Sequence, residues 1–184
     1  MSVRAMPGLP IRLGDVLQAG IVVRDLQASM EAYWRTLGIG PWKVYTYAPP
    51  MLREATLRGR PAEYAMRIAH AQAGPLQLEL IQPLAGGSIF AEHLDAQGEG
   101  LHHIQSRVED IEGVLAAFRR LGVGVLMSGK FGEGEFHFLD TGGLLGVVYE
   151  IFRRKSRPAP EAVYPPELAQ QPGAGPPSAS SGGC

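Results

Sequence analysis

Two segments of this chain, 85 residues apart, carry the same pattern of residues. Gln18–Leu26 can be aligned with His103–Ile111, and each segment is a short, largely apolar stretch that leads into an Asp. Each is followed by an amphipathic segment that stops at a glycine, Gly38 in the first copy and Gly122 in the second. An internal repeat constrains the fold more than any single motif, because both copies must form the same structural unit. The sequence therefore predicts two copies of one module.

Within each copy the spacing of apolar residues changes from strand-like to helix-like and back. Asp25 and Asp110 are suited to begin the helices, because a carboxylate there accepts hydrogen bonds from unpaired backbone N–H groups. The predicted strands are Val16–Val23, Trp42–Tyr47, Glu63–Ala71 and Leu76–Gln82 in the first copy, and Leu101–Val108, Val123–Met127, Glu135–Leu139 and Val147–Phe152 in the second. A loop begins at Pro49, and Ser88 can cap a short helix through Leu94. The pattern predicts an α+β fold in which two tandem β-α-β-β-β modules form one concave mixed sheet.

The chain divides into a leader, one folded domain and a tail. Residues 1–15 form the predicted leader, and residues 16–155 form the domain, made of modules 16–83 and 101–152. Residues 156–184 are rich in Pro, Gly and Ala, and from Gln170 onward they offer almost nothing to bury. We expect this tail to be disordered, because it cannot offset the entropy lost on folding.

Composition excludes several classes of function. The net charge is −1 and the isoelectric point about 6.5, so we expect no nucleic acid or anionic membrane as a partner. Cys184 is the only cysteine, which excludes a disulfide framework and a cysteine zinc site. The sequence has neither a signal peptide nor an apolar run that could span a membrane. We therefore expect a cytoplasmic protein.

Alternation along four predicted strands places polar side chains on the concave face of the sheet. If both modules curl into one sheet, Gln18, Glu79, His103 and Glu150 can converge. Three oxygen ligands and one imidazole nitrogen suit one divalent ion, such as Zn, Co, Ni or Mn, with positions left for water or substrate. A structural zinc site would instead prefer Cys and His in a closed tetrahedron.

Two further residues share the predicted face of His103. Gln105 and Arg107 follow it at strand spacing and are candidate substrate-binding residues. They could hold an anionic or carbonyl group of the substrate. An ion pair that involves Arg107 is the alternative interpretation.

These segments resemble the vicinal oxygen chelate superfamily, which contains glyoxalases, bleomycin-resistance proteins and dioxygenases. The resemblance rests on Gln18–Leu26, Leu78–Pro83, Gly100–Ile104 and Val148–Ile151, and extends over Val16–Phe152. In scaffold the chain is most similar to the methylmalonyl-CoA epimerases, which have His at the first ligand position. The Gln, Glu, His, Glu order instead resembles animal-type glyoxalase I.

The resemblance implies a metal-dependent isomerase, epimerase or lyase that moves a proton next to a carbonyl or thioester of a small molecule. It implies that Glu150 is both a metal ligand and the base. Glu63 lies near the position of the second catalytic glutamate of the epimerases, so it is the candidate second acid or base. The resemblance also implies a homodimer. Whether the two modules pair within one chain or across the dimer stays open.

Two alternatives of the same fold remain. A ring-cleaving dioxygenase would hold iron through two His and one carboxylate, and Gln18 in place of one such His counts against it. A metal-free binding protein needs no ligand set, so Glu79, His103 and Glu150 together argue against it.

Overall fold

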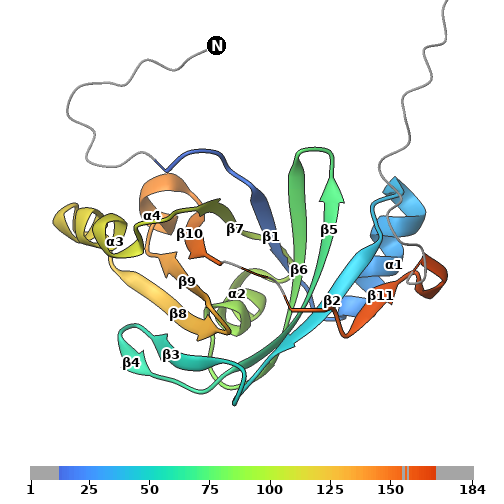
Figure 1. Cartoon of the computed structure of the whole chain (residues 1–184), viewed down its shortest axis with the longest axis horizontal. Helices are drawn as coiled ribbons and strands as arrows, with labels where there is room; N and C mark the ends of the chain where they lie inside the picture. Colours follow the sequence, from blue (N-terminus) through green and yellow to red (C-terminus); the bar gives the residue numbers. More distant parts are fainter. Residues whose placement is uncertain (1–12, 155, 157, 169–184) are drawn as a thin grey trace, which may run out of the picture.

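The computed structural model describes residues 13–154, 156 and 158–168, which form one curved mixed sheet with helices packed against it (Figure 1). The predicted leader, up to residue 12, and the tail from residue 169 lie outside the described residues. The strands are β1 Gln18–Val22, β2 Trp42–Tyr47, β3 Arg53–Leu57, β4 Arg60–Pro61, β5 Ala65–Ala73, β6 Leu76–Ala85, β7 Gly100–Arg107, β8 Val125–Phe131, β9 Gly134–Leu139, β10 Val148–Arg153 and β11 Ala162–Tyr164. The helices are α1 Leu26–Leu37, α2 Ile89–Gln97, α3 Ile111–Arg120, α4 Gly142–Leu145 and a 3-10 turn at Pro166–Leu168.

The strand order confirms the predicted fold class and shows how the two modules meet. The 11 strands run in the order β11-β2-β5-β6-β1-β7-β10-β9-β8-β3-β4. β1 pairs in parallel with β6, and its counterpart β7 pairs in parallel with β10. β1 and β7 then pair with each other in antiparallel orientation. The two modules are therefore joined side by side within one chain, with the equivalent strands β1 and β7 at the centre of the sheet.

The two long helices begin as the sequence predicts. The Asp25 carboxylate accepts a hydrogen bond from the backbone N–H of Ala28 at 3.0 Å, and Asp110 does the same for Gly113 at 2.9 Å. Helix α1 ends at Gly38, whose positive φ of 66° suits the left-handed position after a helix. Each repeat thus encodes its helix boundaries locally.

The apolar residues form separate cores on the two sides of the sheet. Leu26 and Met30 of α1 pack with Leu80 and other residues on the outer face of the first module. Ile111 of α3 packs with Ile151 on the outer face of the second module. A third, largely aromatic cluster lines the inner face, where the two modules curve toward each other. Helices α1 and α3 therefore cover the outside of the sheet, whereas the buried residues of α2 pack in the inner cluster, and the concave side keeps space for a site.

Several segments differ from the predicted pattern. The loop after Pro49 contains the β3–β4 hairpin, which pairs with β8 of the other module. Strand β5 begins at Ala65, two residues later than predicted. The segment predicted as tail contains β11, which pairs with β2. The physical reason is that β3 and β11 pair with strands distant in the sequence, whereas the pattern reports only local spacing.

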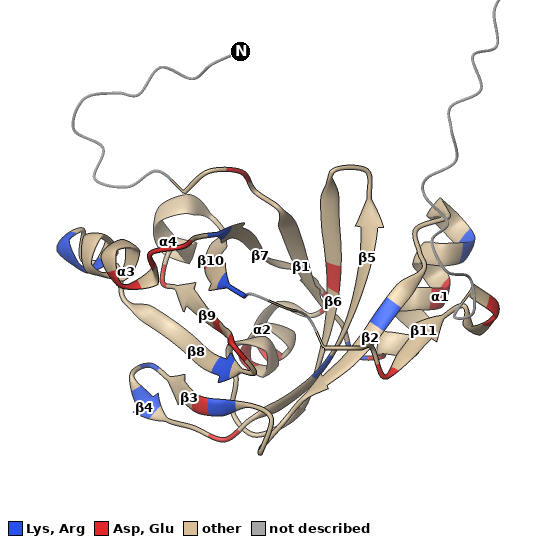
Figure 2. Cartoon of the chain, viewed as in Figure 1, with Lys and Arg blue, Asp and Glu red and all other residues tan. Residues whose placement is uncertain are grey.

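Charged residues of both signs are interspersed over the described chain (Figure 2), in keeping with the net charge of −1. Among the described residues, no helix has the length and apolar character needed to cross a membrane.

Candidate metal centre

Three side chains from three strands meet on the concave side of the sheet. Glu79 of β6, His103 of β7 and Glu150 of β10 each offer one ligand atom, and these atoms lie within 4.8 Å of one another. The Nε2 atom of His103 is 3.4 Å from Glu79 Oε2 and 3.1 Å from Glu150 Oε2. All three side chains are buried. A group of two carboxylates and one imidazole, drawn here from both modules, is of the kind that can hold a divalent cation.

The strand between Glu79 and His103 makes this approach possible. In the sheet register, Gly20 of β1 pairs with Glu79 on one side and His103 on the other. A Cβ atom at Gly20 would lie 1.9 Å from His103 Cε1, so the imidazole ring occupies the space that a side chain would fill. The ring of Phe138 flanks the imidazole, with 4.9 Å between centroids. The absence of a side chain on β1 therefore lets His103 lie across the strand and reach Glu79.

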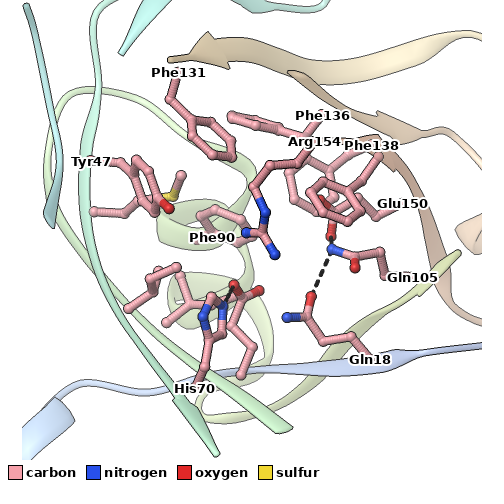
Figure 3. A pocket seen from close by; sticks show the side chains of 15 residues that line it. Gln18, Tyr47, His70, Phe90, Gln105, Phe131, Phe136, Phe138, Glu150 and Arg154 are labelled. Carbon is pink, nitrogen blue, oxygen red and sulfur yellow. Dashed lines mark hydrogen bonds and ion pairs between the residues drawn. The ribbon is translucent and has the colours of Figure 1, made fainter. Parts of the chain in front are cut away.

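The predicted fourth ligand lies in the same cavity but bonds to neighbouring amides. Gln18 Oε1 accepts a hydrogen bond from Gln105 Nε2 at 2.7 Å, and Gln18 Nε2 donates to Gln77 Oε1 at 2.8 Å. Gln105 Nε2 also donates to Glu150 Oε2 at 2.8 Å (Figure 3). Gln105 therefore bridges Gln18 and Glu150. Ligation by Gln18 stays a prediction, for which its oxygen has a second lone pair beside the one that accepts from Gln105.

The surroundings of His103 fit a bound cation. Its Nε2 atom is buried and has no hydrogen-bond partner of suitable geometry, although two carboxylates lie close by. Its Nδ1 atom is 3.2 Å from Nδ1 of His102, whose pKa falls to about 3 because it is buried and lies beside His103. A neutral His102 can accept a hydrogen bond from His103 Nδ1, which leaves the lone pair of Nε2 directed at the carboxylates. A metal ligand needs this tautomer.

The two carboxylates have opposite shifts of their pKa. Burial disfavours the charged form of Glu79, but the neighbouring imidazoles of His103 and His70 outweigh it and lower the pKa of Glu79. Burial raises the pKa of Glu150 above its ordinary value, although His103 opposes this shift. Burial likewise disfavours protonation of His103, but Glu150 and Glu79 outweigh it and raise its pKa to about 9. A divalent cation in this cluster would therefore compete with a proton on His103.

His70 supports the cluster from the neighbouring strand β5. Its Nε2 atom is 2.6 Å from Glu79 Oε1, the carboxylate oxygen farther from His103. The residue is buried and lines the cavity. Such an imidazole orients a ligating carboxylate and so helps to hold it in place.

The space beside the cluster is a cavity with an aromatic wall. Its volume is about 50 Å³, and it adjoins a wider mouth of about 380 Å³. Glu79 lines the cavity, and Figure 3 shows Gln18, Gln105 and Glu150 together on one side of it. Aromatic residues from both modules line the rest: Tyr47, Phe90, Phe131, Phe136, Phe138 and Phe152. The cavity therefore has one polar side, formed by carboxylates and amides, and one apolar side, as small-molecule sites commonly do.

The other predicted site residues lie in different places. Gln105 is buried within the cavity, as described above. Arg107 is exposed at the mouth, where its Nε atom is 3.2 Å from Glu109. Glu63 is exposed before β5 and is not among the residues that line the cavity, because β5 begins two residues later than predicted. The sequence interpretation missed Arg154, which reaches into the cavity from the end of β10. The basic run at residues 153–157 was the available signal.

Comparison with known families agrees with this fold. The sequence profile of the glyoxalase/bleomycin resistance protein/dioxygenase superfamily matches residues 17–139. The chain belongs to this superfamily, as the sequence resemblance predicted. No curated protein matches the chain.

Solved structures of similar fold include methylmalonyl-CoA epimerases. The chain is 26% identical to a variant of the Streptomyces coelicolor methylmalonyl-CoA epimerase in complex with 2-nitronate-propionyl-CoA, with a TM-score of 0.55 over 79% of this chain and 100% of that one. The Mycobacterium tuberculosis epimerase has 23% identity and a TM-score of 0.57 over 77% of this chain and 88% of that one. A hypothetical protein of Bacillus halodurans has 23% identity and a TM-score of 0.60 over 78% of this chain and 96% of that one. At 23% identity, the last two show the fold alone.

Proposed function

We propose that this protein is a metal-dependent isomerase, epimerase or lyase that moves a proton next to a carbonyl or thioester group. The observation that carries the proposal is the buried cluster of Glu79, His103 and Glu150, whose ligand atoms lie within 4.8 Å of one another beside the cavity. A divalent cation in this cluster would polarise the substrate carbonyl and stabilise the enolate that forms when the proton leaves. Without such help, a proton next to a carbonyl is too weakly acidic for a carboxylate to remove.

Each residue of the cluster has its own role in the proposed reaction. Glu79 and His103 would hold the cation, and Gln18 would supply a fourth ligand through its side-chain oxygen. Glu150 is both ligand and base, because it lines the cavity and its Oε2 atom is held by Gln105 at 2.8 Å. A base must lie within hydrogen-bonding reach of the proton that it removes. Its position at the cavity wall supports this role.

The number of bases decides between the reactions. An epimerase returns the proton to the opposite face of the substrate and so needs a second donor. Glu63 is the predicted candidate, and its exposed position outside the cavity gives this role no support. Transfer of a proton between neighbouring carbons, as in glyoxalase I, needs one base on one face. The described site therefore favours a single-base reaction with Glu150.

The structural neighbours indicate which compounds to test first as substrates. The Streptomyces coelicolor epimerase was crystallised with a CoA derivative, and this chain is 26% identical to it. CoA thioesters and glutathione hemithioacetals are therefore the first compounds to test. The predicted homodimer stays a proposal, which sedimentation of the purified protein would test.

The experiment combines metal analysis with solvent exchange. We expect the purified protein to contain a divalent metal and to catalyse deuterium incorporation from D₂O next to the carbonyl of at least one compound in the panel. Glu150→Gln keeps an oxygen ligand but removes the base, so exchange should fall by about 100-fold or more. Glu112→Gln, an exposed change on α3, is the matched control.

Two results would contradict the proposal. Full exchange activity in Glu150→Gln would exclude Glu150 as the base. Protein that takes up no divalent metal would remove the basis of the mechanism and favour a binding protein. Oxygen uptake with catechols would instead support the dioxygenase alternative.

A further inference from the structure

One row of polar side chains crosses four neighbouring strands in the middle of the sheet. In the register, Gln18 of β1 pairs with Gln77 of β6 and with Gln105 of β7, and Gln105 pairs with Glu150 of β10. Hydrogen bonds run along this row: Gln18 Nε2 donates to Gln77 Oε1 at 2.8 Å, and Gln105 Nε2 donates to Gln18 Oε1 at 2.7 Å. Gln105 Nε2 also donates to Glu150 Oε2 at 2.8 Å (Figure 3). Gln105 therefore connects the candidate fourth ligand with the candidate base.

The carboxylate at the end of the row sets the direction of each amide in it. An ionised carboxylate can only accept hydrogen bonds, so Gln105 must turn its NH₂ group toward Glu150. The second N–H of that group is donated to the oxygen of Gln18. The NH₂ group of Gln18 then faces the oxygen of Gln77, which accepts from it. If either amide exchanged its oxygen and nitrogen, two acceptors or two donors would face each other, so the row has one favourable direction.

This direction decides whether Gln18 can be a ligand. The oxygen of an amide has lone pairs for a divalent cation, whereas its NH₂ group only donates hydrogen bonds. Gln105 holds the Gln18 oxygen on the side of β7 and β10, the strands that carry His103 and Glu150. Because this oxygen has two lone pairs, it can accept from Gln105 and still bind a cation. Without the donor at Gln105, nothing in the row would favour the oxygen over the NH₂ group at this place.

The same NH₂ group holds one oxygen of the candidate base. Burial raises the pKa of Glu150, and the hydrogen bond from Gln105 opposes this shift. The amide does so without adding a charge to the buried cluster, so it does not repel a cation there. Gln105 therefore favours the ionised carboxylate, which is the form that a ligand and a base both need.

We propose that Gln105 is a positioning residue whose single NH₂ group fixes the oxygen of Gln18 as a ligand and one oxygen of Glu150 as the base at the same time. The inference rests on the proposed function, because it concerns the same site. The sequence suggested instead that Gln105 binds the substrate directly. The two roles differ in the absence of substrate, where only a positioning residue changes the affinity for a metal ion.

A double-mutant cycle with Zn²⁺ tests the inference without enzyme activity. Gln18→Leu and Gln105→Leu each replace an amide with an apolar side chain of similar volume. Calorimetry on the metal-stripped full chain should show that each single variant binds Zn²⁺ at least about tenfold more weakly than the wild type. In the double variant the two losses should not multiply, because Gln105 acts on the cation in part through Gln18. Wild-type affinity in Gln105→Leu, or losses that multiply, would overturn the inference.

Two further measurements separate positioning from general damage. Co²⁺ bound in place of Zn²⁺ has a visible spectrum that reports its ligands, and Gln18→Leu and Gln105→Leu should change this spectrum in the same way. Should Gln105→Leu fold poorly, the side-chain NH₂ signals of Gln105 in the NMR spectrum of the wild type should still shift when Zn²⁺ is added. Spectra of Co²⁺ that are unchanged in Gln105→Leu, or NMR signals that do not shift, would contradict the inference.

Gln72→Leu is the matched control. Gln72 lies on β5 in register with Gln77, but it is exposed, and its Nε2 atom donates to the backbone oxygen of Gly74 at 3.0 Å within its own turn. The same substitution there should leave the Zn²⁺ affinity and the Co²⁺ spectrum like those of the wild type. A loss as large as that of Gln105→Leu would show that the effect is not specific to the row and would overturn the inference.

The outcomes also distinguish this inference from the proposed function. A protein that binds Zn²⁺ and exchanges protons of a thioester, but shows no coupling between Gln18 and Gln105, contradicts the positioning role alone. A protein that takes up no divalent metal contradicts the proposed function, and denaturant unfolding of the same variants then tests the row. There the double variant should lose less stability than the sum of the two single losses, and additive losses would contradict the inference as well.

Discussion

Gly20→Ala adds a single methyl group, yet it should disrupt the cluster of Glu79, His103 and Glu150. The added methyl group would lie 1.9 Å from His103 Cε1, 2.3 Å from Nε2 and 2.4 Å from Nδ1. The first distance is about 1.5 Å short of the 3.4 Å at which ordinary contact begins. The imidazole is fully buried and flanked by Phe138, so it cannot turn aside within the core. Either His103 leaves the cluster or β1 moves away from it.

The expected magnitude follows from the tolerance of metal sites. Ligand distances in such sites vary by only about 0.2 Å, so a ring displaced by about 1.5 Å no longer serves as a ligand. We expect affinity for Zn²⁺ to fall by at least about 100-fold, measured by calorimetry on metal-stripped protein. Overpacking should also destabilise the fold by about 1–3 kcal/mol. For a domain of this size, the melting temperature should fall by about 2–4 °C for each kcal/mol.

Two controls make the result specific. Gly100→Ala changes a glycine at the start of the neighbouring strand β7, where an added Cβ meets nothing within 4 Å. This variant should bind Zn²⁺ like the wild type. In the double variant Gly20→Ala/His103→Ala the clash is gone, so it should be more stable than the sum of the two single changes predicts. Wild-type Zn²⁺ affinity in Gly20→Ala would refute the reasoning, because it would mean that His103 is free to move or is not a ligand.

Four other predictions concern the same site and its candidate second base. His103→Ala should lose most of the bound metal after dialysis, measured by mass spectrometry, and full metal occupancy would remove His103 from the ligand set. Because Glu150 and Glu79 raise the pKa of His103 to about 9, affinity for Zn²⁺ should rise with pH up to about 9, and binding should release a proton. Calorimetry in buffers of different ionisation enthalpy would measure this proton release. A constant Zn²⁺ affinity between about pH 6.5 and 9 would contradict the prediction. The same shift stabilises the metal-free fold fully below about pH 6.5, and this stability should be lost as the pH rises through about 9, as denaturant titrations would show. Glu63→Gln should leave solvent exchange and turnover unchanged, because Glu63 is exposed outside the cavity; lost racemisation with surviving exchange would instead support a second base.

Local pattern was sufficient for the architecture. Period-two alternation assigns each strand residue to one face, and the repeat gives equivalent strands equivalent roles, so Glu79, His103 and Glu150 could be placed together in advance. Asp25 and Asp110 cap their helices through hydrogen bonds to residues three positions later in the chain, so the local sequence is enough to predict both. These features depend on spacing alone.

The local pattern could not predict which segments distant in the sequence pair with each other as strands. Strand β3 pairs with β8, and Thr56 Oγ1 lies 2.8 Å from Ser128 Oγ across this contact. Strand β11 pairs with β2, beside two hydrogen bonds from Thr46 to the Glu161 carboxylate at 2.8 and 2.9 Å. Neither short segment has an apolar alternation of its own. Each becomes a strand only because an exposed edge of the sheet supplies unpaired backbone groups.

The sequence by itself determined the repeat, the fold class and the three residues that could meet as ligands. Only the tertiary structure decided how they meet: Gly20 leaves the space across which His103 reaches Glu79, and Gln105 holds both Gln18 and Glu150. It also decided that Arg154 reaches the cavity, whereas Glu63 does not. The physical reason is that alternation specifies only the face of a strand, while the distances between atoms depend on register, on the curvature of the sheet and on the volume of neighbouring side chains.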